Sequence, residues 1–166
     1  LELPPVRERV RQAWSTTTAV NFCAKAYPTV ASGHADNAPL QVLAGFMRNG
    51  YLHRAIREQG GAYGGGASQD ASSASFRFFS YRDPRLQETL ADFDAAIDWV
   101  ISSEHKPHQL EEAILGVIAN LDKPASPAGE AKQAYFNRAF GRTLAHRAQF
   151  RKQILSITTA DLKRVA

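Results

Sequence analysis

The chain has 166 residues, 44% of them hydrophobic, which is enough for one domain with a sizeable core. Twenty Lys and Arg against 16 Asp and Glu give a net charge of +4, but no block of five basic residues occurs, so the composition predicts no nucleic-acid partner. No apolar run is long enough to cross a membrane and no secretory signal occurs, which predicts no membrane partner and an intracellular setting, the cytoplasm in a bacterium or an organelle matrix in a eukaryote.

The first third of the chain predicts a lead-in, a strand and two helices. Residues 1–12 contain two adjacent prolines and are expected to form an irregular segment or a short helix. In residues 20–25, Val20, Phe22 and Ala24 alternate with more polar positions, which is typical of a strand with the first set buried. Apolar residues then recur at helical spacing over residues 40–47, which predicts a helix. Asn49-Gly50 is expected to end that helix, and residues 51–58 predict a second, short one.

Residues 60–82 predict a β-hairpin. Residues 60–69 and 74–82 form its two arms, and the turn-forming residues 70–73 join them. In the second arm Phe76, Phe78 and Ser80 alternate with side chains of the other face, which indicates one face packed on a core.

Five helical segments are expected after the hairpin. Asp83 is expected to cap the first, with Pro84 at the first helical position and an apolar stripe over 86–101. The others begin at Pro107, at residue 127 (running to 141), at residue 144 (running to 155), and after Thr158, where Asp161 completes a capping box.

Strands and helices are therefore segregated along the chain. This order predicts an α+β fold, with several helices packed on one face of an antiparallel sheet, rather than a doubly wound sheet. Three strands make a thin sheet for so many helices, so a partner domain or a last strand is expected to be missing from it.

The patterns do not support three other kinds of chemistry. Five of the 11 glycines lie within residues 60–66 and suggest a phosphate-binding loop. The order helix, then glycines, is the reverse of a phosphate-binding loop. The histidines show no H-E-x-x-H or H-x-x-E-H spacing, so no metal ligand is predicted in this chain. No G-x-S-x-G occurs, and Cys23, the single cysteine, is expected to be a small buried hydrophobe rather than a nucleophile.

Arg57 and Tyr63 bracket the first glycines and form the candidate site. Arg57 is expected near a helix end and Tyr63 on a glycine-flanked strand that an extended peptide could lie beside. An Arg can hold a carbonyl or carboxylate, and a tyrosine hydroxyl can donate to a developing oxyanion. The competing interpretation is that Arg57 pairs with a nearby carboxylate and Tyr63 packs on the hairpin.

The sequence around these residues resembles the C-terminal half of the pitrilysin/insulinase-type zinc metallopeptidases, and most closely the presequence protease branch. The similar stretches are residues 50–52, 56–57, 60–65, the run F-F-S-Y-R-D-P at 78–84, and the tail at 154–166. The resemblance covers most of the chain from about residue 17 onward.

The resemblance implies a part of a four-domain protease that closes around a chamber and degrades unfolded peptides. Zinc would be held by H-x-x-E-H and a further glutamate in the N-terminal half. Arg57 would hold backbone carbonyl groups of the peptide substrate and Tyr63 would act in catalysis on the scissile carbonyl. The remaining substrate-binding positions are Gly60, Gly61, Ala62 and Gly64.

Because this sequence lacks H-x-x-E-H, residues 1–166 are interpreted as one domain of a larger peptidase, inactive alone and partnered by the zinc-bearing half of the same polypeptide. Two alternatives stay open. One is a non-catalytic binding or assembly subunit of the same fold, which an absent upstream zinc motif would favour. The other is a self-standing peptide-binding module that uses the strand edge near Tyr63.

Overall fold

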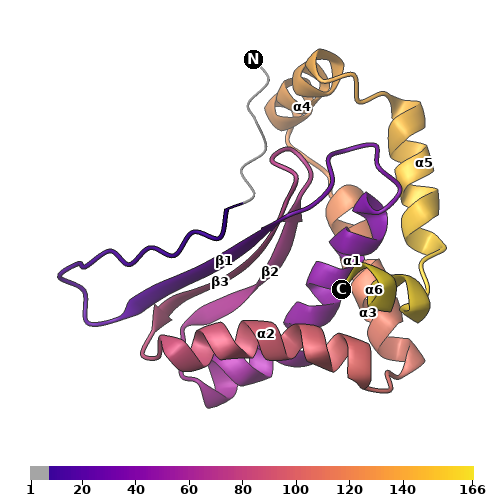
Figure 1. The fold of residues 1–166 in the computed structure, drawn as a ribbon. Coiled ribbons are helices and arrows are strands. Elements are labelled where there is room, and N and C mark those ends of the chain that lie inside the picture. The colour runs from indigo at the N-terminus through magenta and orange to yellow at the C-terminus, as the bar shows by residue number, and fades with distance from the viewer. Residues whose placement is uncertain (1–7) are drawn as a thin grey trace.

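A computed structural model describes residues 8–166, which form a three-stranded antiparallel sheet with helices gathered to one side of it (Figure 1). The elements in chain order are β1 (Asn21–Pro28), α1 (Asn37–Met47), the π-helix η1 (Arg48–Gln59), β2 (Gly64–Asp70), β3 (Ser75–Asp83), α2 (Gln87–Ser102), α3 (Pro107–Leu121), α4 (Pro127–Ala139), α5 (Leu144–Leu155) and α6 (Thr159–Val165). The α+β class predicted from the sequence is confirmed.

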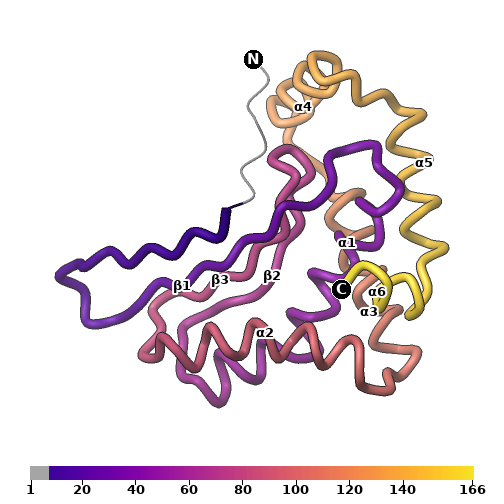
Figure 2. The backbone as a smooth tube through the Cα atoms, viewed as in Figure 1, coloured from indigo at the N-terminus to yellow at the C-terminus, as the bar shows by residue number. Residues whose placement is uncertain are grey.

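The segment before β1 is irregular where it is described. Residues 8–20 contain no helix or strand, and Figure 2 shows this part of the chain reversing direction before it enters β1. The prediction for residues 1–12 therefore holds as an irregular segment over 8–12, and its first seven residues lie outside the described part.

The predicted hairpin forms two of the three strands of the sheet, β2 and β3. The strand order is β1-β3-β2, so β3 pairs with both neighbours and β2 lies at an edge. Phe76, Phe78 and Ser80 are buried on the face toward the helices, as their alternation predicts. The first arm is shorter than predicted, because residues 60–63 form a turn and the strand begins only at Gly64.

The predicted orientation of β1 is wrong. Phe22 is 62% exposed, whereas Cys23, on the opposite face, is buried and pairs with Ser80. The polar residues of this face find partners there, since the Asn21 amide donates to the carbonyl of Asp83 and the Lys25 ammonium pairs with Asp94 of α2. Satisfied polar groups can be turned inward at little cost, and this allows the larger aromatic ring to remain outside.

Asn49-Gly50 does not end the helix as predicted. The backbone continues from α1 directly into η1 with right-handed helical angles at Arg48, so the second helix is joined to the first. A Cβ atom on Gly50 would lie 2.3 Å from the ring of Trp99. The glycine therefore permits close packing of η1 on α2, and tertiary contact overrides its usual role as a terminator.

The helices after the hairpin begin where predicted, except for α2, the first of them. Asp83 is the last residue of β3 and is fully buried, and α2 begins four residues later at Gln87. Its carboxylate accepts hydrogen bonds from the Arg85 N–H (2.9 Å) and the Thr89 hydroxyl (2.8 Å). Asp83 thus fixes the turn before the helix rather than capping the helix itself. The starts of α3, α4 and α5 and the Thr158–Asp161 capping box are confirmed.

Two layers of helices enclose the core. The first contacts the sheet: α1 and η1 lie against β2, and α2 lies against β1. The second packs behind α1 and comprises α3, α5 and α6. The largest fully buried side chains include Phe46, Phe78 and Phe93, and the rings of the last two stack at 5.5 Å. The opposite face of the sheet carries Phe22, Phe79 and Tyr81, which are partly or largely exposed.

Candidate functional site

The candidate site is the turn that leads from η1 into β2. Arg57 lies in the last turn of η1, and its carbonyl accepts a hydrogen bond from the Gly61 N–H (3.1 Å). The Ala62 N–H donates to the carbonyl of Ile56 (3.1 Å), which closes the helix end. Gly61 has φ +77°, a left-handed conformation that glycine adopts without steric cost. These features direct the chain out of the helix and into the edge strand.

Close packing explains the glycines on either side of Gly61. A Cβ atom on Gly60 would lie 2.0 Å from Nη2 of Arg85 and 2.5 Å from the carbonyl oxygen of Ile56. One on Gly64 would lie 2.5 Å from the hydroxyl of Tyr81. Gly60 and Gly64 are buried, as is Ala62 (3% exposed). Between Arg57 and Gly64, the side chains of Arg57 and Tyr63 are therefore well placed to reach outward.

Tyr63 is presented to solvent while its backbone and ring are both held. Its side chain is 63% exposed, and its N–H donates to the carbonyl of Arg82 (3.3 Å). Its ring lies 5.7 Å from the ring of Tyr81, and the guanidinium of Arg82 lies 5.3 Å from its centroid. The contacts all come from the end of β3, so the hairpin carries the tyrosine and fixes its direction.

Arg57 is exposed, and within residues 8–166 its side chain forms no hydrogen bond or ion pair. The adjacent carboxylate, Glu58, pairs instead with His53 at 3.3 Å. The competing interpretation is thus met only in part, since Tyr63 contacts the hairpin but Arg57 has no carboxylate partner in the described chain. A guanidinium with free donors can bind carbonyl or carboxylate oxygens of a ligand.

Arg85 supports the site and was not found by sequence reasoning. Its Nη2 donates to the carbonyl of Ala55 (3.1 Å) and to Asp92 (2.9 Å), which ties the end of η1 to α2. The available signal was the helix start predicted at Pro84, which would put Arg85 and Asp92, seven residues apart, on one helix face, although α2 begins only at Gln87. That spacing alone does not reveal the contact with η1.

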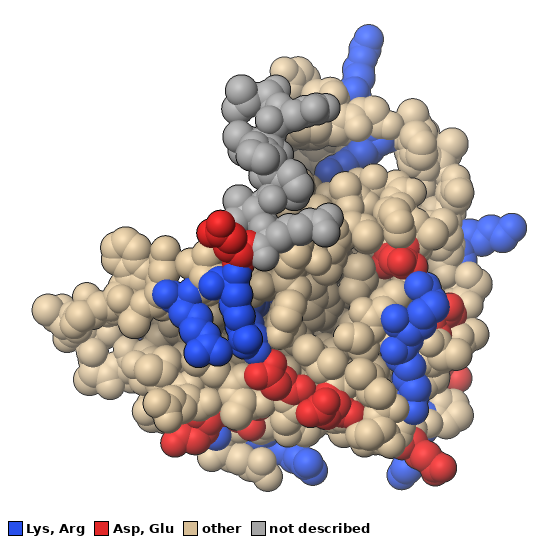
Figure 3. Space-filling view, viewed as in Figure 1, with Lys and Arg blue, Asp and Glu red and all other residues tan. Residues whose placement is uncertain are grey.

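Other chemistry has little support in the described chain. Residues 8–166 contain no cluster of three or more His, Cys, Asp or Glu side chains that could hold a metal. Cys23 is buried, and this burial raises the pKa of its thiol, which disfavours the nucleophilic thiolate. Basic and acidic side chains are interspersed on the face shown in Figure 3, without the single-sign field typical of a nucleic-acid surface.

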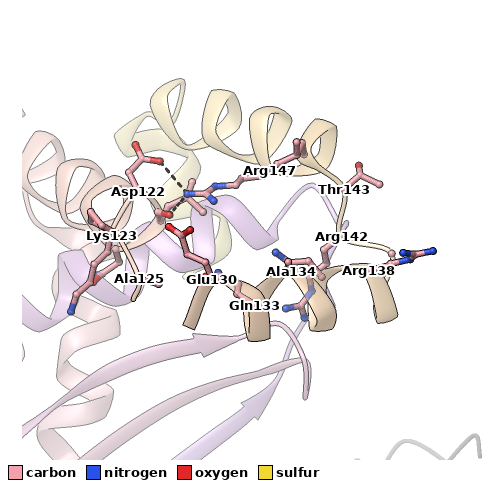
Figure 4. Close-up of a pocket in the computed structure, with 16 residues that line it drawn as sticks. Asp122, Lys123, Ala125, Glu130, Gln133, Ala134, Arg138, Arg142, Thr143 and Arg147 are labelled. Carbon is pink, nitrogen blue, oxygen red and sulfur yellow. Dashed lines mark hydrogen bonds and ion pairs between the residues drawn. The ribbon is translucent and has the colours of Figure 1, made fainter. Parts of the chain in front are cut away.

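A separate hollow of about 1000 Å³ lies between the end of α3, α4 and the start of α5. Figure 4 shows Arg147 of α5 directed at Asp122, and the two side chains form an ion pair at 3.6 Å. No residue of 57–64 lines this hollow. The site predicted from the sequence is therefore an exposed turn rather than a deep pocket.

No helix within residues 8–166 combines the length and the apolar character needed to cross a membrane.

Comparison with solved structures gives the class of the fold. A protease from Helicobacter pylori superposes with a TM-score of 0.70 over 91% of this chain and 38% of its own, at 16% identity. Pitrilysin superposes with a TM-score of 0.64 over 86% of this chain and 16% of its own, at 17% identity. Identities this low show the fold alone, which this chain shares with a domain of pitrilysin and of the Helicobacter pylori protease.

Sequence comparison gives the family. The family model described as "PreP C-terminal domain" matches residues 11–166. The mitochondrial presequence protease of Yarrowia lipolytica is 42% identical over 147 residues, and that of Schizosaccharomyces pombe is 37% identical over 145. The chain belongs to the presequence protease C-terminal domain family. It spans 14% of the length of these two relatives, whereas they match 89% and 87% of it.

Proposed function

We propose that this chain is the substrate-binding C-terminal domain of a zinc metalloendopeptidase that degrades unfolded peptides in a closed chamber. Its Arg57 and Tyr63 would complete an active site whose metal lies in another part of the same polypeptide. The observation that carries the proposal is the presentation of Tyr63, a 63% exposed phenol whose backbone and ring are both held by the end of β3. Membership of a protease family supports the reaction class.

The two side chains have complementary chemistry toward a peptide. The guanidinium of Arg57 would donate to backbone carbonyl oxygens and hold the chain extended, since its donors are not engaged within residues 8–166. The hydroxyl of Tyr63 would donate to the scissile carbonyl as negative charge develops on its oxygen. Gly60, Gly61, Ala62 and Gly64 would form the turn beside the bound peptide, with Gly61 exposed and the other three buried behind it.

The zinc of such a protease does not fit this chain, because residues 8–166 offer no cluster of metal ligands. We assign the metal to the N-terminal half of the same polypeptide and expect no peptide hydrolysis from the 166-residue chain alone. The curated relatives are named as mitochondrial, which supports an organelle-matrix setting if the protein is eukaryotic. The cytoplasm is the expectation for a bacterial one.

The test is to place Tyr63→Phe and Arg57→Ala in the full-length protease and measure cleavage of an unfolded peptide. Loss of an oxyanion donor lowers kcat by about 10²–10³-fold, which is the result expected for Tyr63→Phe. Loss of a charged hydrogen bond is worth about 1.5–3 kcal/mol, so Arg57→Ala should lower kcat/KM by about 10- to 100-fold.

Matched controls separate these roles from general damage. Tyr135→Phe alters a 71% exposed tyrosine on α4, and Arg54→Ala alters another exposed arginine of η1. Both should leave turnover unchanged. Unchanged turnover in Tyr63→Phe and Arg57→Ala would show that the assigned roles are wrong. An upstream sequence without H-x-x-E-H would instead favour the non-catalytic subunit.

A further inference from the structure

The end of β3 contains a bulge that redirects Arg82. Tyr81 pairs with Phe22 and Asp83 pairs with the adjacent Asn21, so Arg82 is an extra residue between these two pairs with no partner in β1. Its φ is +49°, in the left-handed region that non-glycine residues rarely adopt. Bulges of this kind re-aim side chains and are frequent beside functional sites.

The bulge exchanges the faces of two charged residues. Strict alternation after the buried Ser80 would send Arg82 toward the helices and Asp83 outward. The structure has the opposite arrangement, with Arg82 exposed and Asp83 fully buried. The bulge therefore brings a guanidinium to the outer face, where Tyr63 lies.

The redirected residue contacts Tyr63 in two ways. Its carbonyl accepts the Tyr63 N–H at 3.3 Å, and its guanidinium lies 5.3 Å from the centroid of the Tyr63 ring. The first contact fixes the backbone of Tyr63, and the second restrains the ring that carries the hydroxyl. One strained residue thus holds both the backbone and the ring of Tyr63, the residue on which the proposed function depends.

The bulge is anchored from the core side. The buried carboxylate of Asp83 accepts hydrogen bonds from the Arg85 N–H (2.9 Å) and the Thr89 hydroxyl (2.8 Å). The Asn21 amide donates to the carbonyl of Asp83 at 3.2 Å. These contacts over-determine the backbone at Arg82, which is how a strained conformation persists in a folded protein.

The side chain of Arg82 has no competing partner in the described chain. Within residues 8–166 its guanidinium forms no ion pair and no hydrogen bond. It lies instead over the ring of Tyr63. Arg77 on the same strand differs, because it pairs with Asp70 at 3.2 Å. We propose that Arg82 is a positioning residue for Tyr63, an inference that rests on the proposed function of Tyr63.

The test uses Arg82→Gly in the full-length protease, alone and combined with Tyr63→Phe. Glycine accepts the positive φ and keeps the carbonyl that binds the Tyr63 N–H. The Arg82 side chain with its guanidinium is lost while the backbone contact stays, and the unfolding temperature should not fall. A cation–π contact at an exposed site is worth about 0.5–1 kcal/mol, so kcat should fall about two- to fivefold with KM little changed. Arg82→Lys should recover much of this loss, and Arg77→Ala should leave kcat unchanged.

The double variant separates this inference from the proposed function. Arg82→Gly should add nothing once Tyr63→Phe has removed the hydroxyl, because Arg82 would act only through that group. An unchanged kcat in Arg82→Gly, or an equal loss with and without Tyr63→Phe, would overturn the positioning role even if Tyr63→Phe slows turnover. Full turnover in Tyr63→Phe would instead overturn the proposed function.

Discussion

Gly60 and Arg85 pack so closely that a single added methyl group would overlap the guanidinium. A Cβ atom on Gly60 would lie 2.0 Å from Nη2 of Arg85, and 2.5 Å from the backbone oxygen of Ile56. Arg85 cannot move freely to relieve this contact, because the same Nη2 donates to the Ala55 carbonyl and to Asp92. The glycine is therefore required by packing at the point where η1 meets α2.

Gly60→Ala is expected to destabilise the chain by about 1–3 kcal/mol, the usual cost of overpacking. Gly116→Ala is the matched control, since Gly116 lies inside α3 with nothing within 4 Å of its added Cβ. That control should stabilise by about 0.5–1 kcal/mol, because alanine favours the helix. Urea unfolding of both variants gives the comparison. Equal free energies of unfolding for Gly60→Ala and the unaltered chain would contradict the packing account.

Phe78 and Phe79 are neighbours in β3 that point to opposite faces of the sheet. Phe78 is 1% exposed and Phe79 is 37% exposed. Phe78→Ala should lower the free energy of unfolding by about 3–5 kcal/mol, the cost of a large cavity in a core. Phe79→Ala should lower it by about 1 kcal/mol or less. Chemical denaturation measures both, and a larger loss for Phe79 would mean that the orientation of β3 is wrong.

Asp70 gives the hairpin turn a pH dependence. Its carboxylate accepts hydrogen bonds from the backbone N–H groups of Ser72 (2.9 Å) and Ser73 (3.4 Å), and these bonds lower its pKa to about 2. Because the folded pKa lies below the unfolded value of about 3.9, the contribution to stability is full above pH 4 and is lost as pH falls toward 2. An NMR titration of this carboxyl should give a midpoint near 2. A midpoint near 4 would show that the turn bonds are absent.

Thr158 and Asp161 form the capping box of α6. The Thr158 hydroxyl accepts the Asp161 N–H (3.3 Å), and the carboxylate of Asp161 accepts the Thr158 N–H (2.9 Å) and hydroxyl (2.7 Å). Thr158→Ala should destabilise by about 1 kcal/mol, and Thr158→Ser, which keeps the hydroxyl, should cost much less.

The same capping box is sensitive to acid. The bond from the Thr158 hydroxyl lowers the pKa of Asp161, so the stability it adds is present above about pH 4 and declines as pH falls through the lowered value. Thermal unfolding at pH 7 and at low pH should therefore show a smaller effect of Thr158→Ala in acid. An effect that did not change with pH would show that the carboxylate takes no part in the cap.

The sequence by itself determined the features that depend on local pattern. Alternation in residues 74–82 indicated β3 and its buried face, and the capping and proline signals indicated the starts of α3 to α6. Arg57, the glycines and Tyr63 could also be proposed as a site without a structure, because bracketing residues and backbone freedom are visible in the order of residues. Such features are set by short-range sterics and hydrogen bonds, which sequence reports directly.

Tertiary structure decided the features in which a distant residue competes with a local rule. Gly50 continues a helix because Trp99 occupies the space of its missing side chain, and Phe22 faces outward because polar groups of β1 find partners on the inner face. Arg82 faces Tyr63 only because a bulge against β1 interrupts the alternation of β3. Long-range packing and the hydrogen bonding of buried polar groups outweigh local preferences of about 1 kcal/mol. The conformation at such positions can therefore be predicted only when the distant residues that contact them are known.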